Sequence, residues 1–241
     1  MAAPPLTPAL GGVFERARLS AERGFVCDDG HTRNIPLTYD RPRLKLLAFS
    51  DLHRDLGRAE ALVAQSAGVD VVAAVGDFAS VHSGLEETVG ALAAIDRPTL
   101  LVPGNNETED ALRKASAGWA AATVLHGEAT EVEGIRFFGL GAGIPTTPWD
   151  WSFDLDEDEA TAKLGACPEG AVMLVHSPPY GHCDVSGAGV HLGSNAILQA
   201  IERTRPPLVL CGHIHESWGT ESSVGPSRIV NLGPEGRAFE L

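Results

Sequence analysis

The sequence predicts a fold of the α/β class, in which strands and helices alternate along the chain. From residue 44 onward, short apolar runs alternate with longer segments whose apolar residues recur at helical spacing. This alternation is typical of β–α–β units, where helices connect parallel strands. Polar residues of metal-binding types directly follow five of the apolar runs. Because ligands bind at the carboxyl ends of strands in open α/β sheets, the same pattern indicates where a site forms.

Seven apolar runs are predicted to be strands, because they are short and separated by turn-forming or amphipathic segments. In chain order they span residues 44–49, 69–75, 99–102, 135–140, 171–175, 208–210 and 228–232. The last run follows the turn residues Gly225 and Pro226. This end of the chain therefore favours a hairpin over another β–α–β unit.

Five segments between these runs are predicted to be helices. The first spans 56–67, and its side chains at helical spacing are Leu56, Ala59, Leu62, Val63 and Ser66. The others, which fit the same period, span 85–95, 107–117, 156–164 and 194–203. Ser194 is a natural N-cap for the last helix, since its hydroxyl can accept a hydrogen bond from a free backbone N–H.

Residues 1–43 stand apart from this pattern. They hold a Pro-rich start, a polar helical candidate at 13–23 and the turn-like sequence Cys27-Asp28-Asp29-Gly30. We expect them to form an N-terminal extension that packs on the following domain or leads into it. Residues 44–241 then form one large domain, because a chain of 241 residues supports one sizeable core or at most two small ones.

The composition is that of a folded, acidic protein. Hydrophobic residues make up 44% of the chain and charged residues 21%, well outside the disordered range. With Lys+Arg 18 and Asp+Glu 32, the formal net charge is −14. This charge repels nucleic acids and anionic membranes, but bound cations could still attract a small phosphate ester.

Two further features favour a cytoplasmic protein. No apolar stretch reaches the roughly 18 residues of a membrane span, and the N-terminal sequence lacks the pattern of a secretory signal. The cysteines are far apart, without a C-x-x-C pair, at Cys27, Cys167, Cys183 and Cys211. This spacing is typical of reduced thiols and argues against a cysteine-based zinc site. The oligomeric state does not follow from the sequence.

Five predicted strands end in residues with metal-ligand chemistry. These residues are Asp51, His53, Asp77, Asn105, His176, His213 and His215. Each motif alone has a plain structural explanation, since Asp-x-His and Gly-Asp occur in turns and a lone histidine is more often buried and hydrogen-bonded. Five such motifs in order, each at a strand end, are not explained in this way.

The ligand types indicate two transition-metal ions. Residues two apart on an extended segment point the same way, so Asp51/His53 and His213/His215 could each clamp an ion. Imidazole with carboxylate and amide oxygens suits Mn²⁺, Fe or Zn²⁺ with five or six ligands. The set is too large for one ion but suits two that share a carboxylate. The predicted cofactor is therefore two divalent ions, with Mn²⁺ favoured and Fe or Zn²⁺ as alternatives.

Together, these motifs resemble those of the calcineurin-like metallophosphoesterases. The stretches His176-Ser-Pro-Pro-Tyr180 and Val230-Asn-Leu-Gly233 resemble those of the compact prokaryotic cytoplasmic members. The matching motifs are Asp51-x-His53, Gly76-Asp77, Gly104-Asn105-x-Glu107, His176 and Gly212-His213-x-His215, within a resemblance over about residues 44–232. The resemblance implies a four-layered α/β/β/α sandwich around a di-metal centre. It also implies a first metal on Asp51, His53 and His215, a second on Asn105, His176 and His213, and Asp77 as the bridge.

One position departs from the family pattern. The family has a histidine where this chain has Asn106, and that histidine is commonly assigned to bind the phosphate and protonate the leaving group. Asparagine can donate a hydrogen bond but supplies neither that proton nor a positive charge. His182 and His191, expected on loops near the metals, are candidates to replace the acid. The alternative for both is a solvated loop histidine.

Four other residues near these motifs also have candidate roles. Glu107 is predicted to orient backbone or a neighbouring ligand. Trp149 and Trp151, in a loop with prolines and acids, either wall a substrate cleft or cover the core. Arg54, directly after His53, either touches a phosphate or begins the next helix on the surface.

The resemblance implies a metal-dependent phosphoesterase, and the change at Asn106 favours a phosphodiesterase for a small substrate such as a nucleotide phosphodiester. Two ions about 3.5–4 Å apart would clamp the phosphate and lower the pKa of a bridging water. The resulting hydroxide would attack phosphorus in line, with Asn106 stabilising charge on the non-bridging oxygens. The alternatives are a phosphomonoesterase or nuclease of the same fold, or a metal-binding interaction scaffold with little activity.

Overall fold

The structure of the protein is a computed structural model that describes residues 43–241. The predicted extension at 1–43, with its helical candidate and its turn at Cys27, lies outside the described residues apart from Arg43. None of the helices in the described range combines the length and the hydrophobicity that a membrane span requires.

Strands and helices alternate as predicted. The strands are β1 (Lys45–Phe49), β2 (Val71–Val75), β3 (Thr99–Val102), β4 (Ala122–Val124), β5 (Glu128–Val132), β6 (Ile135–Leu140), β7 (Val172–Val175), β8 (Leu208–Cys211), β9 (Glu221–Val224), β10 (Ser227–Asn231) and β11 (Arg237–Glu240). The helices are α1 (Leu56–Ser66), α2 (Leu85–Leu92), α3 (Glu109–Ser116), α4 (Glu157–Leu164) and α5 (Asn195–Thr204), with a 3-10 turn, η1 (His215–Ser217), after β8.

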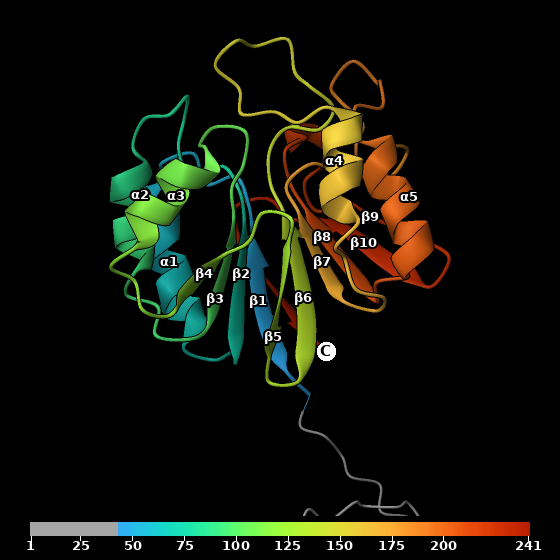
Figure 1. Cartoon of the computed structure of the whole chain (residues 1–241). Coiled ribbons are helices and arrows are strands. Elements are labelled where there is room, and N and C mark those ends of the chain that lie inside the picture. The colour runs from blue at the N-terminus through green and yellow to red at the C-terminus, as the bar shows by residue number, and fades with distance from the viewer. Residues whose placement is uncertain (1–42) are drawn as a thin grey trace, which may run out of the picture. The chain divides into compact units, whose positions relative to one another are not determined.

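The strands form two sheets, ordered β11-β1-β2-β3-β4 and β5-β6-β7-β8-β10-β9. Strands β1 to β4 are parallel in the first sheet, as are β6, β7, β8 and β10 in the second. The antiparallel strands β11, β5 and β9 lie at sheet edges. Helices α1 to α3 cover the outer side of the first sheet, and α4 and α5 that of the second (Figure 1). The fold is the predicted four-layered α/β/β/α sandwich.

Each sheet packs against an apolar core on both of its faces, and alternate residues of a strand belong to different cores. In β2, all five residues are buried. Val71, Ala73 and Val75 belong to the apolar cluster shared by the two sheets, whereas Val72 and Ala74 belong to the cluster beneath α1 to α3. Because successive side chains point to opposite faces, a strand covered on both faces must be apolar throughout. This is why the strand appears in the sequence as an unbroken apolar run.

Three strands were not predicted, namely β4, β5 and β11. The sequence of β5, EATEV, is mostly polar and partly exposed, since β5 is an edge strand. The predicted hairpin is confirmed as β9 and β10. The chain then crosses to the first sheet, where β11 pairs with β1. No local pattern distinguishes such short edge strands from loops.

The predicted cap of the last helix is confirmed, and a second contact reinforces it. Ser194 Oγ accepts a hydrogen bond from the backbone N–H of Ile197. The carboxylate of Glu157, in the first turn of α4, accepts from Ser194 Oγ at 2.9 Å and from the backbone N–H groups of Asn195 at 3.0 Å and Ala196 at 2.7 Å. One helix therefore supplies negative charge to the N-terminus of its neighbour, where the helix dipole favours it.

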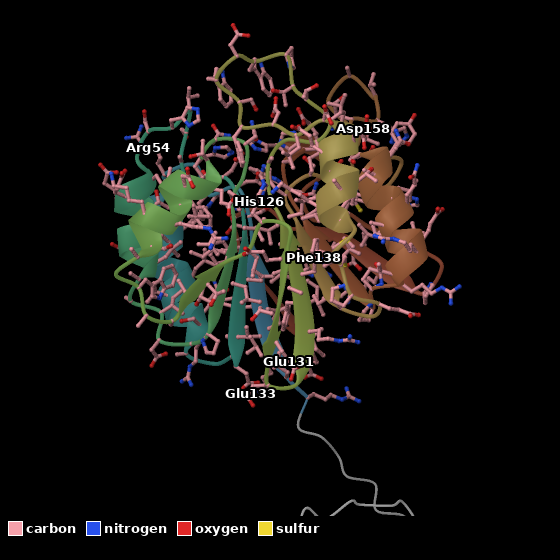
Figure 2. The ribbon with its side chains drawn as sticks, viewed as in Figure 1. Arg54, His126, Glu131, Glu133, Phe138 and Asp158 are labelled. Atoms are coloured by element: carbon pink, nitrogen blue, oxygen red, sulfur yellow. The ribbon has the colours of Figure 1, made fainter. Side chains whose placement is uncertain are left out.

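We predict that Glu157→Ala lowers the free energy of unfolding by about 1–2 kcal/mol, because charge-assisted hydrogen bonds to a helix N-terminus are lost. Asp158→Ala is the matched control, since Asp158 is exposed in the first turn of the same helix (Figure 2). Urea unfolding of the two variants measures the difference. Equal effects of the two substitutions would contradict a specific contact between α4 and α5.

His126 is a buried histidine in the interior of the domain, between β4 and β5 (Figure 2). Its Nδ1 accepts a hydrogen bond from the backbone N–H of Gly141 at 3.2 Å. Burial, assisted by the positive charge of Lys163, lowers the pKa of His126 to about 4. The imidazole is therefore neutral in the folded protein at neutral pH.

The lowered pKa of His126 predicts that the free energy of unfolding decreases at acidic pH. Between an unfolded pKa of about 6.5 and the folded value, the unfolded chain binds a proton that the folded chain does not, so stability falls as the pH drops from 6.5 to 4. The full term is roughly 3 kcal/mol. We predict that His126→Gln, compared with wild type by urea unfolding across this range, loses less stability. Parallel curves for the two proteins would contradict the prediction.

Candidate metal centre

The structure brings the predicted metal ligands together at the carboxyl ends of β1, β2, β3, β7 and β8. Two groups of side chains could each hold an ion: Asp51, His53, Asp77 and His215, and Asp77, His176 and His213. In each group, the candidate ligand atoms lie within 4.8 Å of one another. Asp77 belongs to both groups. This arrangement matches the division implied by the resemblance.

Asn105 joins the second group through its amide oxygen. Asn105 Oδ1 lies 3.1 Å from His213 Nδ1 and 3.4 Å from His176 Nε2. The orientation of the amide is set from the other side, because Nδ2 donates to Ser152 Oγ at 2.9 Å and that hydroxyl donates to Asp154 Oδ1 at 2.6 Å. Ser152 and Asp154 therefore keep the oxygen of Asn105 turned towards the two histidines.

The backbone reaches this geometry in a way that the sequence analysis did not predict. Asp51, His53, Asp77 and His213 have φ values of 57°, 45°, 58° and 68°. These values belong to the left-handed region, which is sparsely populated by residues other than glycine. The expectation that Asp51/His53 and His213/His215 lie on extended segments is therefore wrong. His213 and His215 also belong to different groups, so they do not form one clamp.

Two glycines let the strand ends approach each other closely. A Cβ atom at Gly104 would collide with Oδ1 and the backbone N of Asp77, and one at Gly212 would collide with Oδ2 of Asp51. Glycine is needed where a neighbouring group occupies the space of a side chain. Any other residue at either position would displace a carboxylate of the centre.

The ring nitrogens are arranged to present lone pairs to the centre. His53 Nδ1 lies 3.2 Å from the carbonyl oxygen of Ala79, and His176 Nδ1 lies 2.9 Å from that of Val75. A carbonyl can only accept, so each Nδ1 carries a proton and each Nε2 is left with its lone pair when the ring is neutral. His53 Nε2 then faces His215 Nε2 at 3.1 Å. Such close ring nitrogens fit a shared cation.

The charges of the buried side chains also favour a bound cation. Asp51 and Asp77 are each only 2% exposed. Burial by itself would raise the pKa of Asp77, but His176, His53 and His213 hold it well below its usual range. Burial likewise opposes a charge on His176, yet the adjacent Asp77 raises the pKa of His176 to about 9. Burial raises the pKa of Asp51 instead, because the surrounding histidines do not offset the loss of solvent at that carboxylate. A nearby cation would favour the charged form of both carboxylates, so the residues present fit divalent metal ions.

Glu107 organises the loops that carry these ligands, as predicted. Its Oε1 accepts from the backbone N–H groups of Asp77 at 2.9 Å and Gly104 at 2.7 Å, and its Oε2 accepts from that of Ala79 at 3.0 Å. Burial and the nearby charge of Asp77 raise the pKa of Glu107 to about 7. This carboxylate ties the end of β2 to the end of β3.

Two residues near the C-terminal end of the fold also position ligands, and the sequence analysis did not assign either a role. Trp218 Nε1 donates to Asp51 Oδ2 at 3.2 Å, and its ring lies over that of His215 with centroids 4.3 Å apart. Asn231 Nδ2 donates to the carbonyl oxygens of Gly212 at 3.1 Å and Ile214 at 3.3 Å. The available signals were the short distance of Trp218 from His215 in the sequence and the family-like stretch Val230-Asn-Leu-Gly233, which contains Asn231.

The side chain of Asn106 is engaged in hydrogen bonds within the protein. Its Nδ2 donates to Asp77 Oδ2 at 2.8 Å, its Oδ1 accepts from the backbone N–H of Val81 at 2.8 Å, and its own backbone N–H donates to Asp77 Oδ1 at 2.9 Å. The side chain is only 6% exposed, although it lines the cleft over the centre. Positioning of Asp77 is therefore the role that its contacts show.

The two loop histidines lie on the loop between β7 and α5, at the end of the sheets where the candidate ligands meet (Figure 1). His182 Nδ1 is 2.7 Å from Ser222 Oγ, and His191 Nδ1 is 2.6 Å from Asp184 Oδ1. Neither lines the cleft that contains the candidate ligands. Arg54 also lies away from it, beside Gly84 at the outer edge of the molecule (Figure 2). The nitrogens of His182 and His191 contact Ser222 of β9 and Asp184 of their own loop, so replacement of the family's acid by either histidine stays a prediction.

The cleft itself has a volume of about 660 Å³. At its floor are His53, Asp77, Asn105, His213 and His215, and one of its walls is the loop 145–151 with Trp149 and Trp151. The expectation that the tryptophans wall a cleft is confirmed over the alternative that they cover the core. The described residues that line the cleft include no lysine or arginine.

The shared position of Asp77 predicts that substitutions of Asp77 and of Ser152 differ in their effect on metal binding. Asp77→Ala and Asp77→Asn should both reduce the bound metal from two ions to one or none, because each ion loses a ligand. Ser152→Ala should leave one site intact and weaken the other about 10–100-fold, since it frees only the amide of Asn105. Metal titration calorimetry with elemental analysis measures both. Two tightly bound ions in Asp77→Ala would contradict the shared role.

Comparison with known proteins gives the following similarities. The family model described as calcineurin-like phosphoesterase matches residues 44–217. A UPF0046 protein of Caenorhabditis elegans is 31% identical over 118 residues, which are 46% of this chain and 28% of that protein. Human metallophosphoesterase domain-containing protein 1 is 33% identical over 106 residues, 42% of this chain and 31% of that protein. The matches thus span about a third of these relatives.

Among solved structures, the protein TT1561 of Thermus thermophilus superimposes with a TM-score of 0.65 and 20% identity. The match covers 80% of this chain and 90% of that one. At this identity, the likeness supports the fold alone. It agrees with the order of layers described above.

Proposed function

This chain belongs to the calcineurin-like phosphoesterase family, and from that premise we propose that it hydrolyses a small phosphodiester with the help of two divalent metal ions. Asp51, His53 and His215 would hold one ion and Asn105, His176 and His213 the other, with Asp77 contacting both. We favour Mn²⁺ over Fe or Zn²⁺ because the donors combine nitrogen with hard oxygen ligands. When bound, such ions polarise a phosphoryl oxygen and lower the pKa of water.

The protein's own residues prepare the site before a substrate arrives. Glu107 fixes the backbone around Asp77, Asn106 fixes both oxygens of that carboxylate, and Trp218 fixes Asp51. Catalysis depends on polar groups held in place in advance, because little energy is then spent on reorienting them during the reaction. The network supports a phosphoesterase more strongly than an interaction scaffold, which has no need for it.

The charge of the cleft is the observation that carries the preference for a diester. Apart from the ligand candidates, Glu216 is the one charged residue among the described residues that line the cleft. None of these lining residues is a lysine or an arginine. A phosphomonoester is largely a dianion at neutral pH, whereas a diester carries one negative charge. With fewer positive groups to balance it, the monoester is held less well. The same reasoning, with the net charge of −14, disfavours a long nucleic acid.

The proton supply supports the same preference. The histidines that line the cleft are the ligand candidates His53, His213 and His215, and Asn106 replaces the family's acid. His182 and His191 are paired outside the cleft. Because the described residues offer the cleft no histidine beyond the ligand candidates to neutralise the departing oxygen, the rate should fall steeply as the pKa of the leaving group rises.

We predict that the wild-type protein hydrolyses diesters with a higher kcat/KM than matched monoesters, and that Asn106→His shifts this ratio towards monoesters by about tenfold or more. The substitution should also flatten the dependence of the rate on leaving-group pKa. A series of aryl mono- and diesters, assayed with Mn²⁺, Fe²⁺ and Zn²⁺, measures both effects.

Metal content must be measured in parallel, because Asn106 contacts Asp77 and its replacement could disturb the centre. A wild-type protein that prefers monoesters, with a flat dependence on the leaving group, would contradict the proposal. That result would assign the acid to another residue. A cytoplasmic location and a small-molecule substrate remain predictions from the sequence.

A further inference from the structure

The loop between β6 and α4 places two tryptophans in the same cleft as the candidate metal ligands. This loop and the one between β7 and α5 rise at the end of the sheets where the centre lies (Figure 1). The rings of Trp149 and Trp151 are stacked, with centroids 5.5 Å apart and planes inclined by only 10°. Trp149 nevertheless remains 50% exposed, so much of its surface is available to a ligand.

The tryptophan pair is held in place by contacts on several sides. The ring of His82 meets that of Trp151 edge-on, with planes at 86° and centroids 6.4 Å apart, and His82 Nε2 donates to the carbonyl oxygen of Trp151 at 2.5 Å. At the base of the loop, Asp154 Oδ2 accepts from both the backbone N–H and the hydroxyl of Thr147 at 2.7 and 2.8 Å. The loop is thus built to present a fixed aromatic surface.

The residues at the C-terminal end of the tryptophan loop also link it to the candidate metal centre. Asp154 reaches Asn105 through Ser152, and the backbone N–H of Phe153 donates to the carbonyl oxygen of Asn105 at 2.9 Å. One acidic side chain therefore anchors both the aromatic surface and a candidate metal ligand. Such a common anchor fixes the position of one relative to the other, which is what a substrate spanning both would require.

The lining of the cleft limits what the tryptophans can bind. Leu192, 46% exposed, and Ile214 add apolar surface. Glu216 is negative, and the described lining residues offer no lysine or arginine to a second phosphate or carboxylate. A planar aromatic group without negative charge fits these features, because ring faces stack and little charge has to be balanced.

We infer that Trp149, supported by Trp151 and His82, forms a binding subsite for a planar, uncharged aromatic ester group of the substrate. A nucleobase or an aryl ring would meet this description. The inference rests on the proposed phosphodiesterase function, of which it specifies the substrate class. The substrate would be a phosphodiester with at least one aromatic substituent and no second phosphate.

The test compares two diesters that have the same leaving group, phenyl p-nitrophenyl phosphate and methyl p-nitrophenyl phosphate, with the Mn²⁺-loaded protein. Because p-nitrophenolate departs from both, the ratio of their kcat/KM values, divided by the ratio of their uncatalysed hydrolysis rates, reports how the protein binds the retained group. We expect this corrected ratio to be about ten or more for the wild type. Trp149→Ala should reduce the ratio to near one, and Trp149→Phe should restore most of it.

Tyr180→Ala is the matched control, because Tyr180 is an aromatic residue, 45% exposed, that does not line the cleft. It should leave the ratio unchanged. Melting temperature and bound metal are measured for each variant, so that loss of folding or of metal is recognised. An equal loss of the ratio in Tyr180→Ala would overturn the assignment to Trp149.

Binding of adenosine to the Mn²⁺-loaded protein, followed by ligand-observed NMR, separates the subsite from the chemistry. Hydrolysis of both diesters with a corrected ratio near one, and no adenosine signal that depends on Trp149, would overturn the subsite and leave the proposed function standing. Adenosine binding that Trp149→Ala abolishes, with neither diester hydrolysed, would support the subsite and refute the phosphodiesterase. Absence of both would refute both.

Discussion

The burial of two carboxylates at the meeting of the two sheets is the constraint on which the rest of the structure depends. Asp51 and Asp77 follow β1 and β2 and are almost fully enclosed by protein. An isolated buried carboxylate is strongly unfavourable and must be paired or hydrogen-bonded. The histidines after β7 and β8 supply nitrogen donors from the second sheet, so the centre exists only when both sheets are in place.

A network of hydrogen bonds offsets the cost of enclosing this charge. Glu107 and Asn106 surround Asp77, while Ser50 Oγ at 2.5 Å and Trp218 Nε1 donate to Asp51. Left-handed backbone at the ligand positions adds further cost. The three apolar clusters between the layers provide the stability that tolerates it, and strain of this kind is concentrated where chemistry takes place.

The cleft over the candidate ligands is continuous with this network. Asp154 connects the tryptophan loop to Asn105, and Asn106 connects Asp77 to the loop that carries Val81 and His82. A change in either loop would therefore be felt at the metal ligands. These contacts give Asn106 a positioning role that does not require an acid. Its amide joins a carboxylate to a wall of the cleft, a task that needs a donor and an acceptor together.

The sequence by itself determined the elements whose signals are local. The unbroken apolar runs identified β1, β2 and β3 because both faces of these strands are covered, and Ser194 identified the start of α5 because an N-cap acts within one turn. The ligand candidates were recognisable because they lie within a few residues of the ends of five strands. Resemblance to a family then supplied their division between two ions, which spacing along the chain does not contain.

Only the tertiary structure decided how residues distant in the chain meet. The left-handed turns at Asp51 and His213 arise because their neighbours come from other strands, so an extended segment was the wrong expectation. The pairing of β11 with β1, the contact of Trp218 with Asp51 and the engagement of Asn106 with Val81 all span segments that local patterns do not connect. Local patterns report which side chains are buried, whereas long-range packing chooses their partners.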